Sequence, residues 1–222
     1  MNIAIAIDGP AGAGKSTIAK LAAKELSFIY VDTGALYRAI GLSAYRNGIG
    51  SKDVEGILEL LNTIKVELAF NENHEQVVLL NGEDVSSLIR TPEISMYASD
   101  VSAIPQVRAF LLDLQRNMAK TNNVIMDGRD IGTVVLPDAK IKIFLTASAE
   151  VRAKRRYDEL IEKGMDVKFD DVLNDVVTRD YNDSHRETAP LKPADDSILV
   201  DTSDLDLEQS VAKLISIMKE HM

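Results

Sequence analysis

The hydrophobic positions near the start of the chain form two short apolar runs, each followed by a segment with helical periodicity. NIAIAI at 2–7 suits a buried strand, and TIAKLAAKEL at 17–26 has apolar residues at helical spacing. FIYVDTG at 28–34 repeats the strand-to-turn pattern, and ALYRAIGLSAYRNG at 35–48 predicts a helix that ends at its Asn-Gly pair. This part of the chain therefore predicts two strand–helix units.

The middle of the chain has a pattern typical of a small antiparallel insert. DVEGILELLN predicts a helix, whereas VELAF at 66–70 and QVVLL at 76–80 are strand-like and are joined by the polar turn NENH. The NGED that follows is a hairpin signal, because Asn-Gly accepts positive φ at both turn positions. Residues near 63–86 are therefore expected to form an antiparallel unit.

The remainder returns to alternating helices and strands. Helices follow the insert, and one of them is predicted to open at Pro105, where a missing N–H costs nothing. Further strands are expected at NVIMDGRD, KIKIFLTAS and SILVDTS, and further helices at EVRAKRRYDELIEKG, FDDVLNDVVTRDYNDSHRE and LEQSVAKLISIMKEH. The alternation predicts an α/β fold, with a mostly parallel sheet covered on both faces.

Composition narrows the range of partners. The chain is 45% hydrophobic, enough for one core, and its 25 Lys and Arg against 35 Asp and Glu give a net charge of -10. An acidic chain is a poor general binder of nucleic acid, so an anionic substrate would need local arginine clusters. The absence of cysteine excludes disulfides and thiolate metal sites, and three scattered histidines disfavour a histidine metal site. With no segment of membrane-spanning length and no signal-like start, the cytoplasm is the expected compartment.

The turn after the first strand carries a phosphate-binding motif. The sequence fits G-x-x-x-x-G-K-[ST] between a strand and a helix, so its backbone N–H groups can wrap phosphate oxygens at a helix N-terminus. Lys15 would bridge the β- and γ-phosphates and Ser16 would bind Mg²⁺. A turn that only links strand and helix does not require these residue types, so a nucleoside triphosphate with Mg²⁺ is predicted. The residues involved are Gly9, Pro10, Ala11, Gly12, Ala13, Gly14, Lys15, Ser16 and the adjoining Thr17.

The loop does not identify the reaction, but other residues narrow it. The chain has no N-K-x-D guanine signature, which disfavours a GTPase, and a small acceptor kinase is the simplest hypothesis. Transfer to a hydroxyl generally uses a carboxylate base, whereas transfer to a phosphate requires several guanidiniums that fork onto its oxygens. Arginines stand near predicted element ends or on polar helix faces, and the alternative for each is an ordinary surface ion pair. They are Arg38, Arg129, Arg152, Arg155, Arg156, Arg179 and Arg186.

Two helical segments group some of these arginines. Arg152, Arg155 and Arg156 are spaced i, i+3, i+4 and are predicted to reach one side of a helix. In TRDYNDSHRE, Arg179, Asp183 and Arg186 are spaced i, i+4, i+7, and we expect them to share one helical face. The carboxylate of Asp183 in that face would repel phosphate, so Asp183 is expected to bind a different part of the ligand.

Three aspartates follow apolar runs, at the carboxyl ends of predicted strands. They are Asp8, Asp32 and Asp127. Ligands of open α/β sheets bind at this edge, so one of the three is expected to orient Mg²⁺ through water. The pattern does not rank them, and capping of the next element is the alternative for Asp32 and Asp127.

The order of four stretches resembles the bacterial-type cytidylate kinases over essentially the whole length. These are IDGPAGAGKST, VDTGALYR, DGRDIGTVVLPDA and RDYNDSHRETAPL, together with the antiparallel insert. The resemblance implies phosphoryl transfer from ATP to CMP or dCMP, giving CDP or dCDP and ADP. It implies a P-loop three-layer fold with five parallel strands in one kinase domain over 1–222, divided into a monophosphate-binding part at 34–100, a short helical lid at 150–168 and a core. Small-molecule nucleotides are the implied partners, and a monomer is expected.

The resemblance also implies roles for individual residues. Lys15, Arg129, Arg152, Arg156 and Arg179 would be catalytic, and Arg155 would contact ATP. The acceptor nucleotide would be held by Thr33, where many relatives have serine, and by Tyr37, Arg38, Ser99, Arg108, Arg129, Asp130, Arg179, Asp183 and Arg186. Asp183 is implied to accept hydrogen bonds from the ribose hydroxyls.

The chemistry of cytosine agrees with this assignment. Its N4 amine donates while N3 and O2 accept, so Asp130 could accept from N4 while Arg108 and Ser99 donate. Uracil reverses donor and acceptor at two positions and would leave a buried carboxylate facing a carbonyl oxygen. Without the resemblance, a loop salt bridge to Arg129 is the alternative role for Asp130, and a core position that for Tyr37.

Two other hypotheses remain at this point. One is a kinase of a small hydroxyl metabolite, with Asp32 as the base. The other is a nucleotide-binding regulatory module without turnover, against which the intact Lys15 and Ser16 argue.

Overall fold

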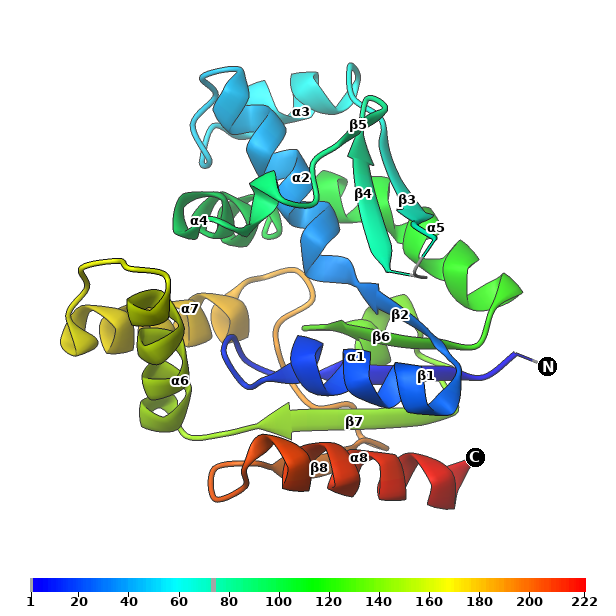
Figure 1. The fold of residues 1–222 in the computed structure, drawn as a ribbon. Helices are drawn as coiled ribbons and strands as arrows, with labels where there is room; N and C mark the ends of the chain where they lie inside the picture. Colours follow the sequence, from blue (N-terminus) through cyan, green and yellow to red (C-terminus); the bar gives the residue numbers. More distant parts are fainter. Residues whose placement is uncertain (1, 73–74) are drawn as a thin grey trace.

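The computed structural model describes residues 2–72 and 75–222 and has a parallel sheet with helices on both faces (Figure 1). The five strands run in the order β2-β6-β1-β7-β8, and all their pairings are parallel, which confirms the predicted fold class. The strands are β1 (Ala4–Asp8), β2 (Ile29–Asp32), β6 (Val124–Gly128), β7 (Ile141–Thr146) and β8 (Ile198–Asp201). The helices are α1 (Lys15–Leu26), α2 (Thr33–Arg46), α3 (Val54–Leu61), α4 (Pro92–Val101), α5 (Pro105–Thr121), α6 (Ala149–Glu162), α7 (Phe169–His185) and α8 (Leu207–His221).

Alternate side chains of the central strand face opposite helical layers. Ile5 and Ile7 of β1 pack in one core with residues of α1 and α8, while Ala6 packs in a second core with residues of α5. Figure 1 shows α1 and α8 lying together over one face of the sheet. Because both faces are buried, the strands read as continuous apolar runs rather than as alternating patterns.

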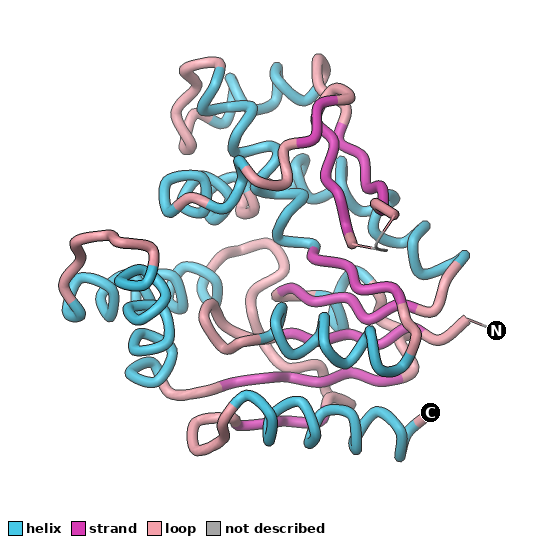
Figure 2. The backbone as a smooth tube through the Cα atoms, viewed as in Figure 1, coloured by secondary structure: helices cyan, strands magenta, loops and turns pink. Residues whose placement is uncertain are grey.

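The predicted antiparallel insert forms a separate three-stranded sheet beside β2 (Figure 2). It consists of β3 (Val66–Phe70), β4 (Gln76–Leu80) and β5 (Glu83–Asp84), paired in that order. Asn81 and Gly82 have φ of 51° and 84°, which confirms the Asn-Gly hairpin turn between β4 and β5. The other predicted turn, NENH, includes Asn73 and His74, which lie outside the described residues.

Helix boundaries follow local signals in the sequence. Pro92 and Pro105 are the first residues of α4 and α5, where proline loses no hydrogen bond. Two short helical turns, η1 (Leu88–Arg90) and η2 (Ile131–Val135), precede α4 and follow β6. Within 2–72 and 75–222 no helix combines the length and apolarity needed to cross a lipid bilayer.

The carboxyl edge of the parallel sheet gathers segments that are far apart in the sequence. Asp8 and Asp32 end β1 and β2, and Asp127 is the penultimate residue of β6, in register with Asp32. The first turns of α1 and α2 begin at the same edge, because α2 directly follows β2 and α1 follows β1 after the short phosphate loop. This edge therefore brings the predicted phosphate loop and the three predicted aspartates together.

Candidate active site

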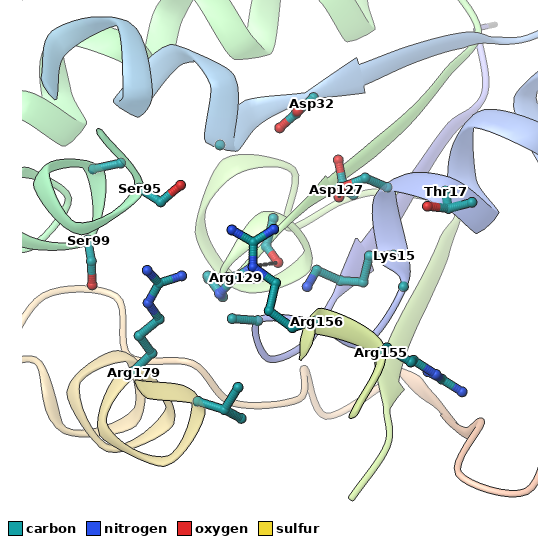
Figure 3. Close-up of a pocket in the computed structure, with 18 of the residues that line it drawn as sticks. Lys15, Thr17, Asp32, Ser95, Ser99, Asp127, Arg129, Arg155, Arg156 and Arg179 are labelled. Atoms are coloured by element: carbon teal, nitrogen blue, oxygen red, sulfur yellow. Dashed lines mark hydrogen bonds between the residues drawn. The ribbon is translucent and has the colours of Figure 1, made fainter. Parts of the chain in front are cut away.

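One large cavity opens at the carboxyl edge of the parallel sheet. Its volume is about 840 Å³, and residues of the phosphate loop, α2, α4, α6 and α7 line it. Figure 3 shows Lys15, Arg129, Arg156 and Arg179 approaching the same space from different elements. The predicted site residues that line it are Ala11, Gly12, Gly14, Lys15, Ser16, Thr17, Thr33, Tyr37, Arg38, Ser99, Arg108, Arg129, Asp130, Arg155, Arg156, Arg179, Asp183 and Arg186.

Four predicted site residues do not line this cavity, namely Gly9, Pro10, Ala13 and Arg152. Gly9 lies against β7, and only a residue without a side chain fits there, since a Cβ would lie 1.9 Å from the carbonyl oxygen of Leu145. Its φ of +150° adds a second reason for glycine. Gly9 thus lets the loop approach the sheet closely.

The phosphate loop places a buried lysine at the start of α1. Lys15 is 5% exposed, and its Nζ donates to the carbonyl oxygen of Pro10 at 2.7 Å. Burial, together with the positive charge of Arg129, lowers the pKa of Lys15 to about 7. Gly14, with φ of 84°, provides the left-handed residue that turns the loop into the helix. The amine of Lys15 is therefore only partly protonated near pH 7, and a bound anion would favour its protonated form.

Ser16 and Asp127 form a pair of oxygen ligands beside this lysine. The Ser16 hydroxyl donates to one Asp127 carboxylate oxygen at 2.8 Å, and the Tyr30 hydroxyl donates to the other at 3.0 Å. Burial and the neighbouring charge of Asp32 raise the pKa of Asp127 to about 6. Hydroxyl and carboxylate oxygens are the ligands that Mg²⁺ prefers, so this pair fits the predicted ion.

The other two edge aspartates are occupied by protein groups. The carboxylate of Asp8 accepts from the backbone N–H groups of Ile131 and Gly132, each at 2.7 Å, and so holds the segment after β6. Asp32 caps α2 by accepting from the N–H of Ala35 at 3.0 Å. Of the three candidates for a metal, Asp127 is the one that contacts Ser16.

Asp32 also binds two arginines of the cavity. Arg38 Nη2 lies 2.7 Å from Asp32 Oδ2, and Arg90 Nη2 lies 3.3 Å from the same oxygen. Both of its oxygens are thus engaged, which argues against a role as a free base. Sequence reasoning missed Arg90, although its position directly before the helix start at Thr91-Pro92 is a recognisable signal.

Arg129 and Asp183 bridge the sheet and α7 across the cavity floor. Arg129 Nε donates to Asp183 Oδ2 at 2.8 Å, and Asp183 is 7% exposed. Burial alone would lower the pKa of Arg129, but the charge and hydrogen bond of Asp183, together with the charges of Asp127 and Asp8, raise that pKa overall. The cation next to Lys15 is therefore fixed in place and fully charged.

Arg179 projects from α7 into the cavity with hydrogen-bonding capacity to spare. Burial lowers its pKa, and its Nε is among the buried donors without a hydrogen-bond partner in the described part of the chain. A buried guanidinium with an unused donor is costly to leave unpaired. An anion in the cavity would satisfy it.

Arg186 lines the cavity but does not share the helical face of Arg179 and Asp183, so that prediction is wrong. α7 ends at His185, and Arg186 has extended backbone, with φ of -64° and ψ of 144°. The chain then turns back, so that Arg186 Nε donates to the carbonyl of Ala189 at 2.8 Å. The arginine reaches the cavity from a turn rather than from the helix.

The three arginines of α6 do not converge as their spacing predicted. Arg156 pairs with Glu159 at 2.7 Å, and Arg155 donates to the carbonyl of Thr202 at 2.9 Å, at the edge of the cavity (Figure 3). Arg152 turns the other way, is 4% exposed and pairs with Asp180. Spacing places three Cα atoms on one side of a helix but does not set the direction of long side chains, which partners decide.

A buried polar cluster closes the opposite end of the cavity. Arg108 forms a hydrogen-bonded ion pair with Asp130, and its guanidinium carbon lies 5.6 Å from the centre of the Tyr37 ring. Arg186 Nη2 is 3.6 Å from the same carboxylate. The alternative partner considered for Asp130, Arg129, is bound to Asp183 instead.

Thr33 and Ser99 complete this end of the cavity. The Thr33 hydroxyl donates to the carbonyl of Asp127 at 2.7 Å and is buried, so it also ties α2 to β6. Ser99 lies on α4 together with Ser95, and Figure 3 shows both hydroxyls at the cavity wall. The two ends therefore differ in chemistry, with cations and a phosphate loop at one and mixed donors and acceptors at the other.

Comparison with known proteins shows one family. A family model described as cytidylate kinase matches residues 5–220. A cytidylate kinase of Caldicellulosiruptor saccharolyticus is 54% identical over 97% of this chain and 95% of its own length. One from Carboxydothermus hydrogenoformans is 50% identical over 96% of each chain. A solved structure of an uncharacterized protein from Eubacterium ventriosum, 14% identical, covers 98% of this chain and 99% of its own with a TM-score of 0.55, a likeness of fold alone.

Proposed function

The chain belongs to the cytidylate kinase family, and we propose that its large cavity binds both nucleotides with their phosphates meeting at Lys15. The enzyme transfers a phosphoryl group from ATP to CMP or dCMP, giving CDP or dCDP and ADP. The observation that carries the proposal is the convergence of Lys15, Arg129 and Arg179 on one space, where an unused buried donor remains. Two polyanions can approach each other only where several cations offset their repulsion.

The donor nucleotide would occupy the end formed by the phosphate loop. Backbone N–H groups of Ala11 to Ser16 and the ammonium of Lys15 bind its phosphates, as the dipole of α1 also favours. Arg155 and the loop before α8 line the outer part of this end and suit the adenosine. The lid predicted at 150–168 would include Arg155 and Arg156 of α6, and it would exclude water from the reacting phosphates.

The acceptor nucleotide would occupy the opposite end. Arg38, Arg129 and Arg179 would bind its phosphate, and Arg90 joins them from η1. Asp183 would accept from the ribose hydroxyls. When the phosphate takes over Arg129, the carboxylate of Asp183 that now holds this arginine becomes free for the hydroxyl donors of the nucleoside.

The base would be recognised by the buried cluster behind the acceptor phosphate. Asp130 would accept from the N4 amine of cytosine, and Arg108 and Ser99 would donate to its acceptors, with Arg186 beside them. Asp130 is 4% exposed, so a uracil carbonyl placed against it would leave both groups without a partner.

Mg²⁺ would be held by Ser16, with Asp127 beside it. When bound, the ion neutralises the charge that develops on the transferring phosphoryl group. To test this role we would measure the Mg²⁺ concentration that gives half-maximal rate in Ser16→Ala, Asp127→Asn and the wild type. In each variant this concentration is expected to rise at least about tenfold, the usual effect of removing a residue that contacts or orients a bound metal ion. An unchanged requirement in both would contradict the assignment.

A kinase of a hydroxyl acceptor, with Asp32 as base, is one of the two other hypotheses. The contacts of Asp32 with Ala35, Arg38 and Arg90 oppose it, since a base needs a free oxygen directed at the acceptor. We propose a monomer, the state expected from the sequence. The net charge of -10 opposes nucleic acid as a partner. We propose the cytoplasm as the compartment and no membrane partner, since the substrates of the proposed reaction are small-molecule nucleotides.

A further inference from the structure

Arg152 is buried where α6, α7 and the phosphate loop meet, outside the cavity. Its Nε donates to the carbonyl of Ala147 at 2.8 Å, and its Nη1 donates to the carbonyl of Ala11 in the loop at 2.9 Å. Nη1 and Nη2 also donate to the two oxygens of Asp180 at 2.9 and 2.5 Å. This guanidinium is thus committed to protein groups on three segments.

We propose that Asp180 is a positioning residue, which acts through Arg152 to fix the phosphate loop in its binding shape. The proposal rests on the proposed function of that loop. A two-point fork between carboxylate and guanidinium sets the plane of the guanidinium as well as its position. With that plane set, Nη1 is aimed at the carbonyl of Ala11.

The backbone of the loop is fitted to this contact. Gly12 follows Ala11 and has φ of +75°, and a Cβ on it would lie 3.3 Å from the Cβ of Arg152. Only glycine allows α6 to approach the loop this closely at that φ. The chain of contacts from Asp180 through Arg152 to Ala11, called the tie below, therefore acts where the loop turns toward the site proposed for the phosphates.

Asp180 also stands in the part of α7 that faces the acceptor. Arg179 precedes it and Asp183 follows one turn later, and both line the cavity. The Arg152–Asp180 pair therefore joins the loop that binds the donor to the helix turn that binds the acceptor. A shift of this turn would move the loop with it.

The competing reading is that Arg152 contacts a phosphate itself during turnover. That requires its pairs with Asp180 and Ala11 to break. Under that reading, loss of Asp180 frees Arg152 for the phosphate, whereas loss of Arg152 removes a catalytic cation. Under our proposal, the two losses are equivalent because they break the same tie.

The test compares Asp180→Asn, Arg152→Gln and the double variant with the wild type. Equilibrium binding of ATP is measured without CMP, and kcat and KM for ATP are then measured with saturating CMP. Each single variant is expected to lose about tenfold or more in ATP affinity, because misplacing a binding group by about 1 Å has effects of this order. The ATP affinity of the double variant is expected to match that of Arg152→Gln within about threefold, because the effects of two substitutions that break the same contact do not add. Asp158→Asn, which removes an exposed pair with Lys154 on α6, should change nothing.

Two results would overturn the proposal. In the first, Asp180→Asn keeps the kcat and ATP affinity of the wild type, while the kcat of Arg152→Gln falls by about a thousandfold. A loss of that size is expected for a cation that contacts the transferred phosphoryl group. The other is losses that multiply in the double variant. Asp180→Asn could unfold because it leaves the buried Arg152 without a partner. The double variant has no such buried charge, so it can be measured in that case. Wild-type ATP affinity in the double variant would then refute the positioning role of the Arg152–Asp180 pair. ATP binding is measured without acceptor, so an error in the proposed acceptor site would leave this result intact.

Discussion

At the scale of single residues, Lys15 connects burial to function. Its ammonium is bound by the carbonyl of Pro10, and its pKa is lowered to about 7 by burial and by Arg129. A triphosphate brings negative charge to the same place, which favours the protonated form and raises the pKa again.

We therefore expect ATP binding to take up a proton at pH 8. The free enzyme holds Lys15 mostly neutral there, because pH 8 is above its pKa of about 7, while Asp127, with a pKa of about 6, is already ionised. Calorimetric titration with MgATP in buffers of different ionisation enthalpy should show an uptake approaching about one proton per ATP. The uptake should fall toward pH 6, where Lys15 is already charged, and vanish in Lys15→Met. Binding heats independent of buffer at pH 8 would contradict the role of Lys15.

Asp130 is the residue that we propose selects the base. Asp130→Ala should relax the preference for CMP over UMP, because the carboxylate that accepts from N4 is removed. The ratio of kcat/KM values is expected to fall by about one to two orders of magnitude. Asp138→Ala, at an exposed position a few residues away, is the control and should leave the ratio unchanged. An unchanged ratio in Asp130→Ala would show that another group reads the base.

At the scale of elements, the side chain of Gln76 links the antiparallel insert to the edge of the cavity. Gln76 at the start of β4 accepts from the N–H of Asp32 at 2.8 Å and donates to its carbonyl at 3.2 Å. Asp32 in turn caps α2 and holds Arg38. The insert therefore helps to position the start of α2, the helix that carries the proposed acceptor contacts of Thr33, Tyr37 and Arg38.

Gln76→Ala should lower the free energy of unfolding by about 1–2 kcal/mol, since two partly buried hydrogen bonds are lost. It should also raise KM for CMP and leave KM for ATP within about twofold, because both hydrogen bonds of the Gln76 side chain go to Asp32, at the start of α2. Glu75→Gln is the matched control, since it removes an exposed pair with Lys20 and should leave the melting temperature and both KM values unchanged. Equal effects of the two substitutions on KM for CMP would refute the positioning role.

The elements also show which features a single sequence can predict. Periodicity located the strands and helices, since both depend on neighbouring residues. Helix ends and side-chain directions were less predictable. Arg186 was placed on α7 by spacing alone, although Pro190 shortly after it is a signal that the helix ends. Arg152 was directed to the cavity because the position of Asp180 on a different helix cannot be derived from local spacing.

At the scale of the whole molecule, the sheet order determines the site. β1 lies between β6 and β7, so the phosphate loop that follows it is placed beside Asp127 and against Arg152 of α6. Such pairings join residues more than a hundred positions apart and depend on the packed core, so the sequence predicted a parallel sheet but not its order. For the same reason it could not rank Asp8, Asp32 and Asp127, which their contacts now distinguish.

The distribution of charge is also a property of the whole chain. The net charge is -10, yet cationic side chains outnumber anionic ones in the cavity lining. An acidic surface with a basic cleft attracts small anions to that cleft and disfavours extended polyanions elsewhere. This distribution agrees with nucleotides as substrates.

The central claim is that this cavity brings ATP together with a cytidine monophosphate. Its most direct test is the initial rate with MgATP and, in turn, CMP, dCMP, UMP, AMP and glycerol as acceptors. We predict the highest kcat/KM with CMP or dCMP, a value lower by about tenfold or more with UMP, and rates near background with AMP and glycerol. Turnover of AMP or glycerol equal to or greater than that of CMP would contradict the account.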